Sequence, residues 1–124
     1  MTILVDSDII IEVTRARNEQ ILARWYGLVQ GSQPILYSPV SAAELWAGAW
    51  VNEHARLTNL FNALICVPVD YSIGKRAGEY LQRYSPSHAI DFPDAVVAAT
   101  AVSSGAALWT NNRKHYPMPE LTLV

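Results

Sequence analysis

The sequence predicts an α/β fold in which a mainly parallel sheet of four to five strands is flanked by helices. Short apolar runs typical of buried strands alternate along the chain with segments whose apolar residues recur at helical spacing. The composition, with 51% hydrophobic and 16% charged residues, is that of a chain that folds around a core. The length of 124 residues suits one domain, so we expect a single domain over residues 1–124.

The predicted strands are short and apolar. They cover residues 2–5, 34–37, 65–69 and 106–110, and a fifth candidate covers 121–124. Pro68 has no backbone N–H to donate, so we expect it toward the end of its strand. Cys66 lies within the apolar run Leu64-Ile65-Cys66-Val67, which predicts a buried and unreactive thiol.

Six helices are expected between and after these strands. The first follows Asp6, with Ser7, Asp8 or Asp6 itself as its N-cap, and the others cover about 18–29, the segment carrying Glu44, 52–64, 72–84 and 91–104. Residues 85–88 are expected to form a loop. Asp91 begins the sequence Asp-Phe-Pro-Asp, which is typical of a capped helix with proline in its first turn, so we interpret Asp91 as a cap first and a ligand second.

The acidic residues occur in unusually apolar surroundings. Glu44 is the only charged residue between Ile35 and Val51, Asp94 follows Asp91 in another apolar stretch, and Asp6 directly follows the first strand. An ionised carboxylate is costly to bury without a partner. These carboxylates therefore indicate a site for a cation.

The strand order along the chain predicts where that site lies. In an open parallel sheet, ligands bind beyond the carboxyl ends of the strands. Asp6 ends the first strand, Asn111 and Asn112 follow the fourth, and one crevice can also collect Glu44 and Asp94. Carboxylate oxygens without clustered histidines or thiolates favour a hard cation, Mg²⁺ or Mn²⁺.

Four segments together resemble the successive motifs of PIN-domain proteins of the VapC toxin type. They are Asp6 after an apolar strand, Ser41-Ala-Ala-Glu44-Leu45-Trp-Ala-Gly48, Pro93-Asp94-Ala-Val-Val-Ala-Ala-Thr-Ala101 and Leu108-Trp-Thr-Asn-Asn-Arg-Lys-His-Tyr-Pro117. The resemblance spans nearly the whole chain and implies a PIN-like three-layer sandwich. It also implies that Asp6, Glu44 and Asp94 are the metal-binding and catalytic acids. Asn112 stands where a fourth acid commonly occurs, which weakens a second metal site.

The resemblance implies a function as well. A VapC-type protein is a metal-dependent endoribonuclease, the toxin of a type II toxin–antitoxin pair, in which a metal-activated water hydrolyses an RNA phosphodiester and leaves a 5′-phosphate. Ser7, Asp91 and Asn111 are accessory candidates at the site, and Arg113 and Lys114 are candidates for contacts to the RNA backbone. The implied partners are a small VapB-like antitoxin, which reaches the acidic cleft, and a second toxin molecule in a homodimer.

Charge, hydropathy and the spacing of histidines argue against several other classes of protein. A net charge of −2 argues against binding nucleic acid through bulk positive charge. No apolar run approaches the ~20 residues of a membrane span, and a single cysteine fits a reducing cytoplasm. The histidines His54, His88 and His115 lack metal-ligand spacing and are expected at the surface or in loops.

Two rival functions stay open from the sequence. Leu4-Val5-Asp6-Ser7-Asp8 resembles the Asp-x-Asp of haloacid-dehalogenase phosphatases, in which Asp8 would act as general acid and Lys75 would assist, whereas Glu44 would have no role. The other rival is a PIN-like domain that binds RNA or protein without cleaving it, which the asparagine at position 112 suggests.

Overall fold

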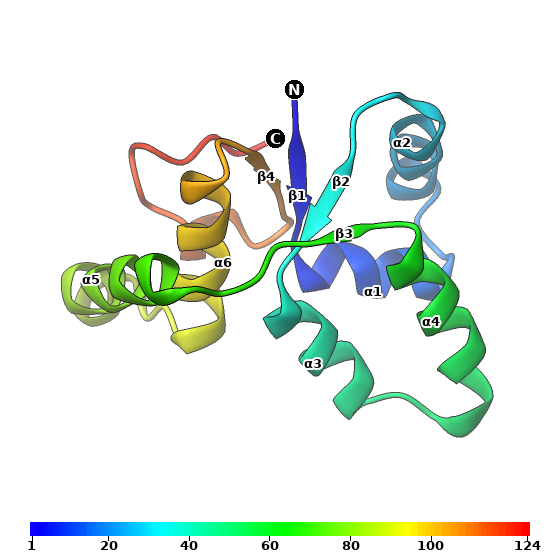
Figure 1. Cartoon of the computed structure of the whole chain (residues 1–124), viewed down its shortest axis with the longest axis horizontal. Helices are drawn as coiled ribbons and strands as arrows, with labels where there is room; N and C mark the ends of the chain where they lie inside the picture. Colours follow the sequence, from blue (N-terminus) through cyan, green and yellow to red (C-terminus); the bar gives the residue numbers. More distant parts are fainter.

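A computed structural model describes all residues, 1–124, and contains one four-stranded parallel sheet. The strands are β1 (Ile3–Val5), β2 (Ile35–Tyr37), β3 (Ile65–Cys66) and β4 (Ala107–Trp109), in the order β3-β2-β1-β4 (Figure 1). β1 pairs with β2 on one side and with β4 on the other. The predicted parallel α/β sheet is confirmed.

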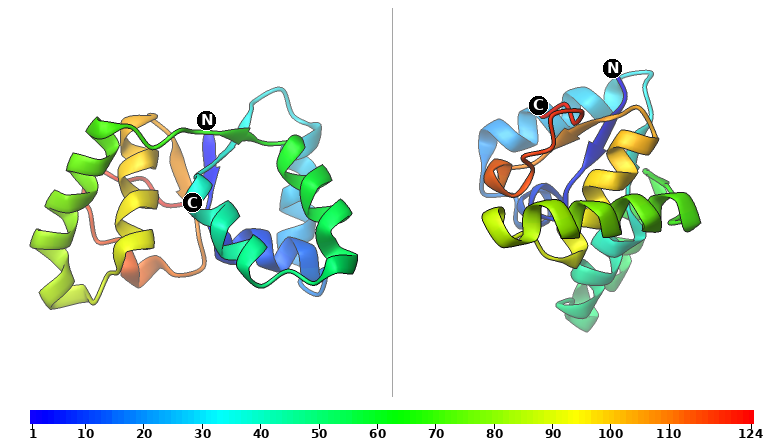
Figure 2. Two further views of the ribbon diagram at one scale, coloured as in Figure 1. Left: turned by 60° about the horizontal axis from the view of Figure 1, so that its bottom comes forward. Right: turned by 90° about the vertical axis from the view of Figure 1, so that its left-hand side faces the viewer.

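Six α-helices and two short 3₁₀ helices complete the fold. They are α1 (Ser7–Arg15), α2 (Glu19–Gln30), α3 (Pro39–Ala47), η1 (Val51–Glu53), α4 (His54–Asn62), α5 (Tyr71–His88), α6 (Phe92–Ser103) and η2 (Arg113–His115). α5 and α6 lie side by side, and the first four α-helices gather on the opposite side of the molecule (Figures 1 and 2).

The sheet separates two apolar clusters because neighbouring strand residues point to opposite faces. Leu4, Leu36 and Leu108 face α5 and α6, in a cluster that contains the buried alanines and valines of α6. Ile3 and Trp109 face the other way, toward buried residues of α1, α2 and α4. The layers are therefore helices, sheet and helices, as the resemblance to PIN domains implied.

The first residue after each of two central strands caps the next helix. The Asp6 side chain accepts a hydrogen bond from the Ser7 N–H at the start of α1, and the Ser38 side chain accepts one from the Val40 N–H at the start of α3. Of the caps that the sequence allowed for α1, Ser7 and Asp8 were wrong and Asp6 is confirmed, because the helix already begins at Ser7 and leaves Asp6 in extended geometry. Asp91 caps α6, as predicted.

α5 is longer than the sequence predicted. Residues 85–88, expected as a loop, continue the helix to His88, with Pro86 inside its last turn. Proline removes one backbone hydrogen bond, but this cost falls at the helix end, where Ala89 adopts left-handed geometry and its N–H closes on the Ser85 carbonyl. Packing along α6 offsets the remaining cost.

The edges of the sheet differ from the predictions in two ways. β3 has only two residues, and both Ile65 and Cys66 are exposed, so the buried thiol predicted for Cys66 was wrong. An apolar run at a sheet edge has a neighbouring strand on one side only, and both residues of β3 stay exposed here. At the other edge, the candidate fifth strand makes a single parallel bridge, Leu123 to Leu108.

None of the helices is both long and apolar enough to span a lipid bilayer.

Candidate active site

Acidic side chains from three parts of the chain line one pocket of about 180 Å³ at the carboxyl ends of the central strands, hereafter the acid pocket. Five of its ten lining residues are carboxylic acids, and none is lysine or arginine. The lining residues are Asp6, Ser7, Asp8, Glu44, Asp91, Pro93, Asp94, Val97, Asn112 and His115. The three acids singled out from the sequence thus lie in a single crevice.

Asp6 is the most buried of these acids, with 6% of its surface exposed. Its Oδ1 accepts a hydrogen bond from the Ser7 N–H at 2.8 Å. Its Oδ2 accepts from the Thr110 hydroxyl at 2.9 Å and from the Tyr116 hydroxyl at 2.7 Å. These donors compensate the burial of the charge and hold the carboxylate in one orientation.

Asp94 lies in the first turn of α6 and enters the acid pocket beside Asp91. The two form a capping box, in which Asp91 Oδ1 accepts from the Asp94 N–H at 3.1 Å and Asp94 Oδ2 accepts more weakly from the Asp91 N–H at 3.5 Å. Burial, followed by hydrogen bonding with and repulsion from Asp91, raises the pKa of Asp94 to about 6. Keeping Asp94 ionised in the metal-free pocket therefore costs free energy.

Glu44 projects from the second turn of α3. Partial burial, together with repulsion from Asp6 and Asp91, raises the pKa of Glu44, and a hydrogen bond with Ser7 partly offsets this. Glu44 is exposed as a residue. It can therefore lose its proton to solvent and reorient within the pocket.

Asp8 is tied to the segment after β4. Its Oδ2 accepts from the Asn111 N–H at 3.0 Å and lies 3.4 Å from the Thr110 hydroxyl, whereas its Oδ1 is buried without a hydrogen-bond partner. Burial and repulsion from Asp6 raise the pKa of Asp8. The interpretation of Asp8 as a helix cap was wrong, because Asp6 caps α1 and the Asp8 side chain accepts from the Asn111 N–H after β4.

His115 and Asn112 complete the wall nearest η2. His115 Nδ1 lies 3.1 Å from Asp94 Oδ2 and 2.8 Å from the Asn112 side-chain nitrogen. Because one ring nitrogen carries at most one proton, Nδ1 either donates to Asp94 or accepts from Asn112. His115 lies partly exposed in the segment after β4, as expected of a surface or loop histidine, but it also contacts Asp94 in the acid pocket. Its chain position, in a loop after a strand, gave no signal of this contact.

The donor set of the acid pocket fits a hard divalent cation. Several carboxylates share one hollow, three of them have raised pKa values, and a buried Asp8 oxygen lacks a partner. A cation would relieve both the repulsion and the desolvation. As the side chains stand, no three histidine, cysteine, aspartate or glutamate groups are close enough to hold a metal. Binding would therefore require the carboxylates to turn toward each other.

The remaining candidates divide by location. Ser7, Asp91 and Asn112 line the acid pocket. Asn111 lies outside it and reaches it only through the hydrogen bond of its backbone N–H to Asp8. Arg113 and Lys114 lie exposed on η2, and Lys114 lines a shallow hollow with His88 that shares His115 with the acid pocket.

Sequence reasoning missed two residues that hold the acids, Thr110 and Tyr116. Thr110 ends the fourth predicted strand, and its hydroxyl was a readable signal because it directly precedes the two asparagines. Burial and the neighbouring Asp6 raise the pKa of Tyr116, so its hydroxyl stays a donor. Lys75, which the phosphatase interpretation requires, is exposed on α5 and does not line the acid pocket.

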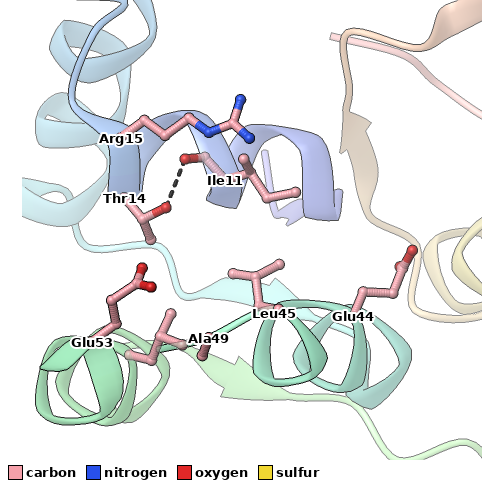
Figure 3. Close-up of a pocket in the computed structure, with 9 residues that line it drawn as sticks. Ile11, Thr14, Arg15, Glu44, Leu45, Ala49 and Glu53 are labelled. Atoms are coloured by element: carbon pink, nitrogen blue, oxygen red, sulfur yellow. Dashed lines mark hydrogen bonds between the residues drawn. The ribbon is translucent and has the colours of Figure 1, made fainter. Parts of the chain in front are cut away.

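A second pocket, of about 320 Å³, lies between α1 on one side and α3, η1 and α4 on the other, hereafter the α1–α3 groove (Figure 3). Its walls combine apolar side chains such as Leu45 with Arg15 and Glu53. Glu44 lines both this groove and the acid pocket. The two pockets are therefore neighbours that share the Glu44 side chain.

Comparison with known proteins identifies the family. The model of the PIN domain family matches residues 3–121. The chain is 37% identical over 123 residues to ribonuclease VapC10 of Mycobacterium tuberculosis, covering 95% of this chain and 88% of that protein. It is 36% identical over 96 residues to ribonuclease VapC19 of the same species, covering 76% of this chain and 77% of that one.

Solved structures share the fold. A DNA-bound VapBC from Salmonella typhimurium has a TM-score of 0.82 at 20% identity, over 100% of this chain and 97% of that one. VapC20 of Mycobacterium tuberculosis, a toxin that cleaves the sarcin–ricin loop, has a TM-score of 0.71 at 16% identity, over 98% and 99% of the two chains.

Proposed function

Because the chain belongs to the PIN domain family, we propose that it is an endoribonuclease, the toxin of a VapBC-type toxin–antitoxin pair, and that the acid pocket is its active site. The observation that carries this proposal is the convergence of Asp6, Glu44 and Asp94 on one hollow without a lysine or arginine. Acids arranged in this way are suited to a divalent cation and through it to phosphate. The phosphatase alternative loses support because Lys75 lies elsewhere.

Asp6, Glu44 and Asp94 would hold Mg²⁺ or Mn²⁺. Such an ion, when bound, supplies positive charge at the scissile phosphate and acidifies water for hydrolysis. Asp6 is fixed by its three donors, whereas exposed Glu44 is free to adjust. The Asn112 side chain lines the same pocket and offers an amide oxygen, a weaker ligand than a fourth carboxylate.

Positive charge for the RNA backbone would come from outside the acid pocket. Lys114 and His88 line the shallow hollow that shares His115 with that pocket, and Arg113 is exposed beside them on η2. We propose that an RNA strand passes over this hollow, with Lys114 and Arg113 contacting phosphates and Ser7 hydrogen bonding near the cleaved bond. These contacts position the strand without reading its bases.

We propose that a VapB-like antitoxin binds the α1–α3 groove. The groove has apolar side chains for a partner segment and shares Glu44 with the neighbouring acid pocket. A basic side chain of the partner reaching past Glu44 would meet several carboxylates, which favours inhibition by charge complementarity. Copurification with a small protein encoded beside this chain tests the proposal.

We also propose that the protein forms a homodimer and that it acts in the cytoplasm. Light scattering tests the first of these and cell fractionation the second.

The direct test is incubation of the purified chain with total RNA in Mg²⁺, in Mn²⁺ and in EDTA, followed by mapping of the ends. We expect cleavage with a divalent ion only, and its loss in Glu44→Gln and Asp94→Asn. Glu79→Gln, an exposed position on α5 that lines no pocket, is the matched control and should cleave normally. RNA binding without any cleavage would instead favour the non-enzymatic PIN-like domain.

A further inference from the structure

We propose that Tyr116 is a positioning residue that orients the Asp6 and Asp94 carboxylates for metal binding. This inference rests on the proposed function, because it concerns the same metal site. Tyr116 does not line the acid pocket and lies behind it, so it has no direct contact with substrate in this assignment.

The Tyr116 hydroxyl touches acids from two different parts of the chain. It lies 2.7 Å from Asp6 Oδ2, at the end of β1, and 3.4 Å from Asp94 Oδ1, in the first turn of α6. An ionised carboxylate only accepts hydrogen bonds, so the phenol donates. The one phenolic proton is shared between the two carboxylates: the strong arm of the hydrogen bond goes to Asp6 at 2.7 Å and the weak arm to Asp94 at 3.4 Å.

No other side chain makes this link. The Thr110 hydroxyl also donates to Asp6 Oδ2, but its second contact is Asp8 rather than Asp94. His115 contacts Asp94 but has no hydrogen bond to Asp6. Tyr116 is therefore the one described group that couples the first and third of the proposed ligands.

Burial makes the coupling rigid. Tyr116 is 3% exposed and packs in the same apolar cluster as α6, so its ring cannot swing away from the acids. Removing a group that orients a metal ligand typically lowers metal affinity roughly 10- to 100-fold, even though the group does not touch the metal. Removal of this hydroxyl should thus weaken metal binding while the ring still fills its space.

The test compares two variants of the full chain. Tyr116→Phe deletes the hydroxyl at the site. Tyr80→Phe deletes a matched one, because the Tyr80 hydroxyl donates to Glu120 at 2.6 Å outside the acid pocket. Mn²⁺ alone is titrated into each folded protein by calorimetry. We expect Mn²⁺ to bind about 10-fold more weakly to Tyr116→Phe than to the wild type, and equally to Tyr80→Phe and the wild type.

The outcomes separate this inference from the proposed function. Wild-type protein that binds no Mn²⁺ overturns the metal site itself. Wild-type binding with equal or tighter binding by Tyr116→Phe overturns the role of Tyr116 and leaves the site intact. An equal loss in Tyr80→Phe also overturns it, because the effect would then be general loosening of the fold.

A second measurement needs no variant at position 116. The protons of buried, hydrogen-bonded hydroxyls that exchange slowly give proton NMR signals. Each tyrosine signal is identified by its nuclear Overhauser contacts with the protons of its own ring, and that of Tyr80 also by its absence in Tyr80→Phe. Addition of Mg²⁺ to the wild type should shift the Tyr116 signal and leave that of Tyr80 in place. Mg²⁺ binding without such a shift would contradict the inference even if Tyr116→Phe does not fold.

Discussion

Replacing Asp94 with asparagine should stabilise the metal-free protein while it removes activity. The carboxylate is held in the acid pocket against burial and against the neighbouring Asp91, which together raise its pKa to about 6. Asparagine has nearly the same shape and no charge. The substitution therefore removes the repulsion and keeps the packing.

The size of the effect follows from the pKa. Raising it from 3.8 to about 6 corresponds to about 3 kcal/mol between the two protonation states before solvent screening. The side chain keeps 15% exposure beside an open pocket, so water screens much of this. We expect Asp94→Asn to raise the free energy of unfolding by about 1 kcal/mol at pH 7 in EDTA.

The pH dependence has a defined sign. A carboxylate whose pKa is raised by folding binds its proton more readily in the folded state, so its destabilising effect is full above about pH 6 and absent below about pH 4. Urea denaturation in EDTA at pH 7 and at pH 4 measures this. The advantage of Asp94→Asn over the wild type should shrink at the lower pH. If Asp94→Asn were less stable than wild type at pH 7, it would refute the claim that burial and repulsion from Asp91 make the ionised Asp94 destabilising.

Three further outcomes follow from individual residues. Glu44→Gln should lower RNA cleavage at least about 100-fold with an unchanged circular dichroism spectrum, because an exposed side chain contributes little to the fold. Asp91→Ala should lower the free energy of unfolding by about 1 kcal/mol in urea, whereas Asp91→Ser, which can still cap α6, should lose less. Cys66 should react with a thiol reagent in the native protein at the rate of an exposed cysteine, and protection from the reagent would contradict the exposed edge at β3.

The layered fold and the place of the acids were readable from the sequence. Asp6 follows an apolar strand, and Asp94 is the last residue of a capping motif, so the geometry of parallel sheets already placed them at one edge. Local signals were enough because each acid is attached to the end of a regular element. Glu44 differs, since it lies in the second turn of α3, and its place in the pocket depends on the angle of that helix.

The residues that hold the acids were harder to predict. Tyr116 reaches Asp6 across 110 positions of sequence, and His115 reaches Asp94 through the turn of η2. Neither contact belongs to a repeating pattern, since both depend on how the segment after β4 returns to the sheet. From the sequence alone, Tyr116 could equally be an ordinary core residue, because only the fold shows which group its hydroxyl contacts.

The exposure of Cys66 could not be predicted from the sequence, because it depends on the position of β3 at the edge of the sheet. The run around Cys66 has the composition of a core strand, but β3 lies at the end of the strand order and only one side pairs. Strand order is a long-range property that composition does not encode. The extension of α5 through Pro86 has a similar origin, because packing on α6 outweighs a local helix-breaking signal.

The central claim is that Asp6, Glu44 and Asp94 together bind a divalent cation that RNA cleavage requires. A crystal of the active protein grown with Mn²⁺, examined by anomalous X-ray scattering, tests it most directly. We expect an ion in the acid pocket with oxygens of all three side chains within bonding distance. An ion bound elsewhere, or an empty acid pocket in a protein that cleaves RNA in the same Mn²⁺ solution, would contradict it.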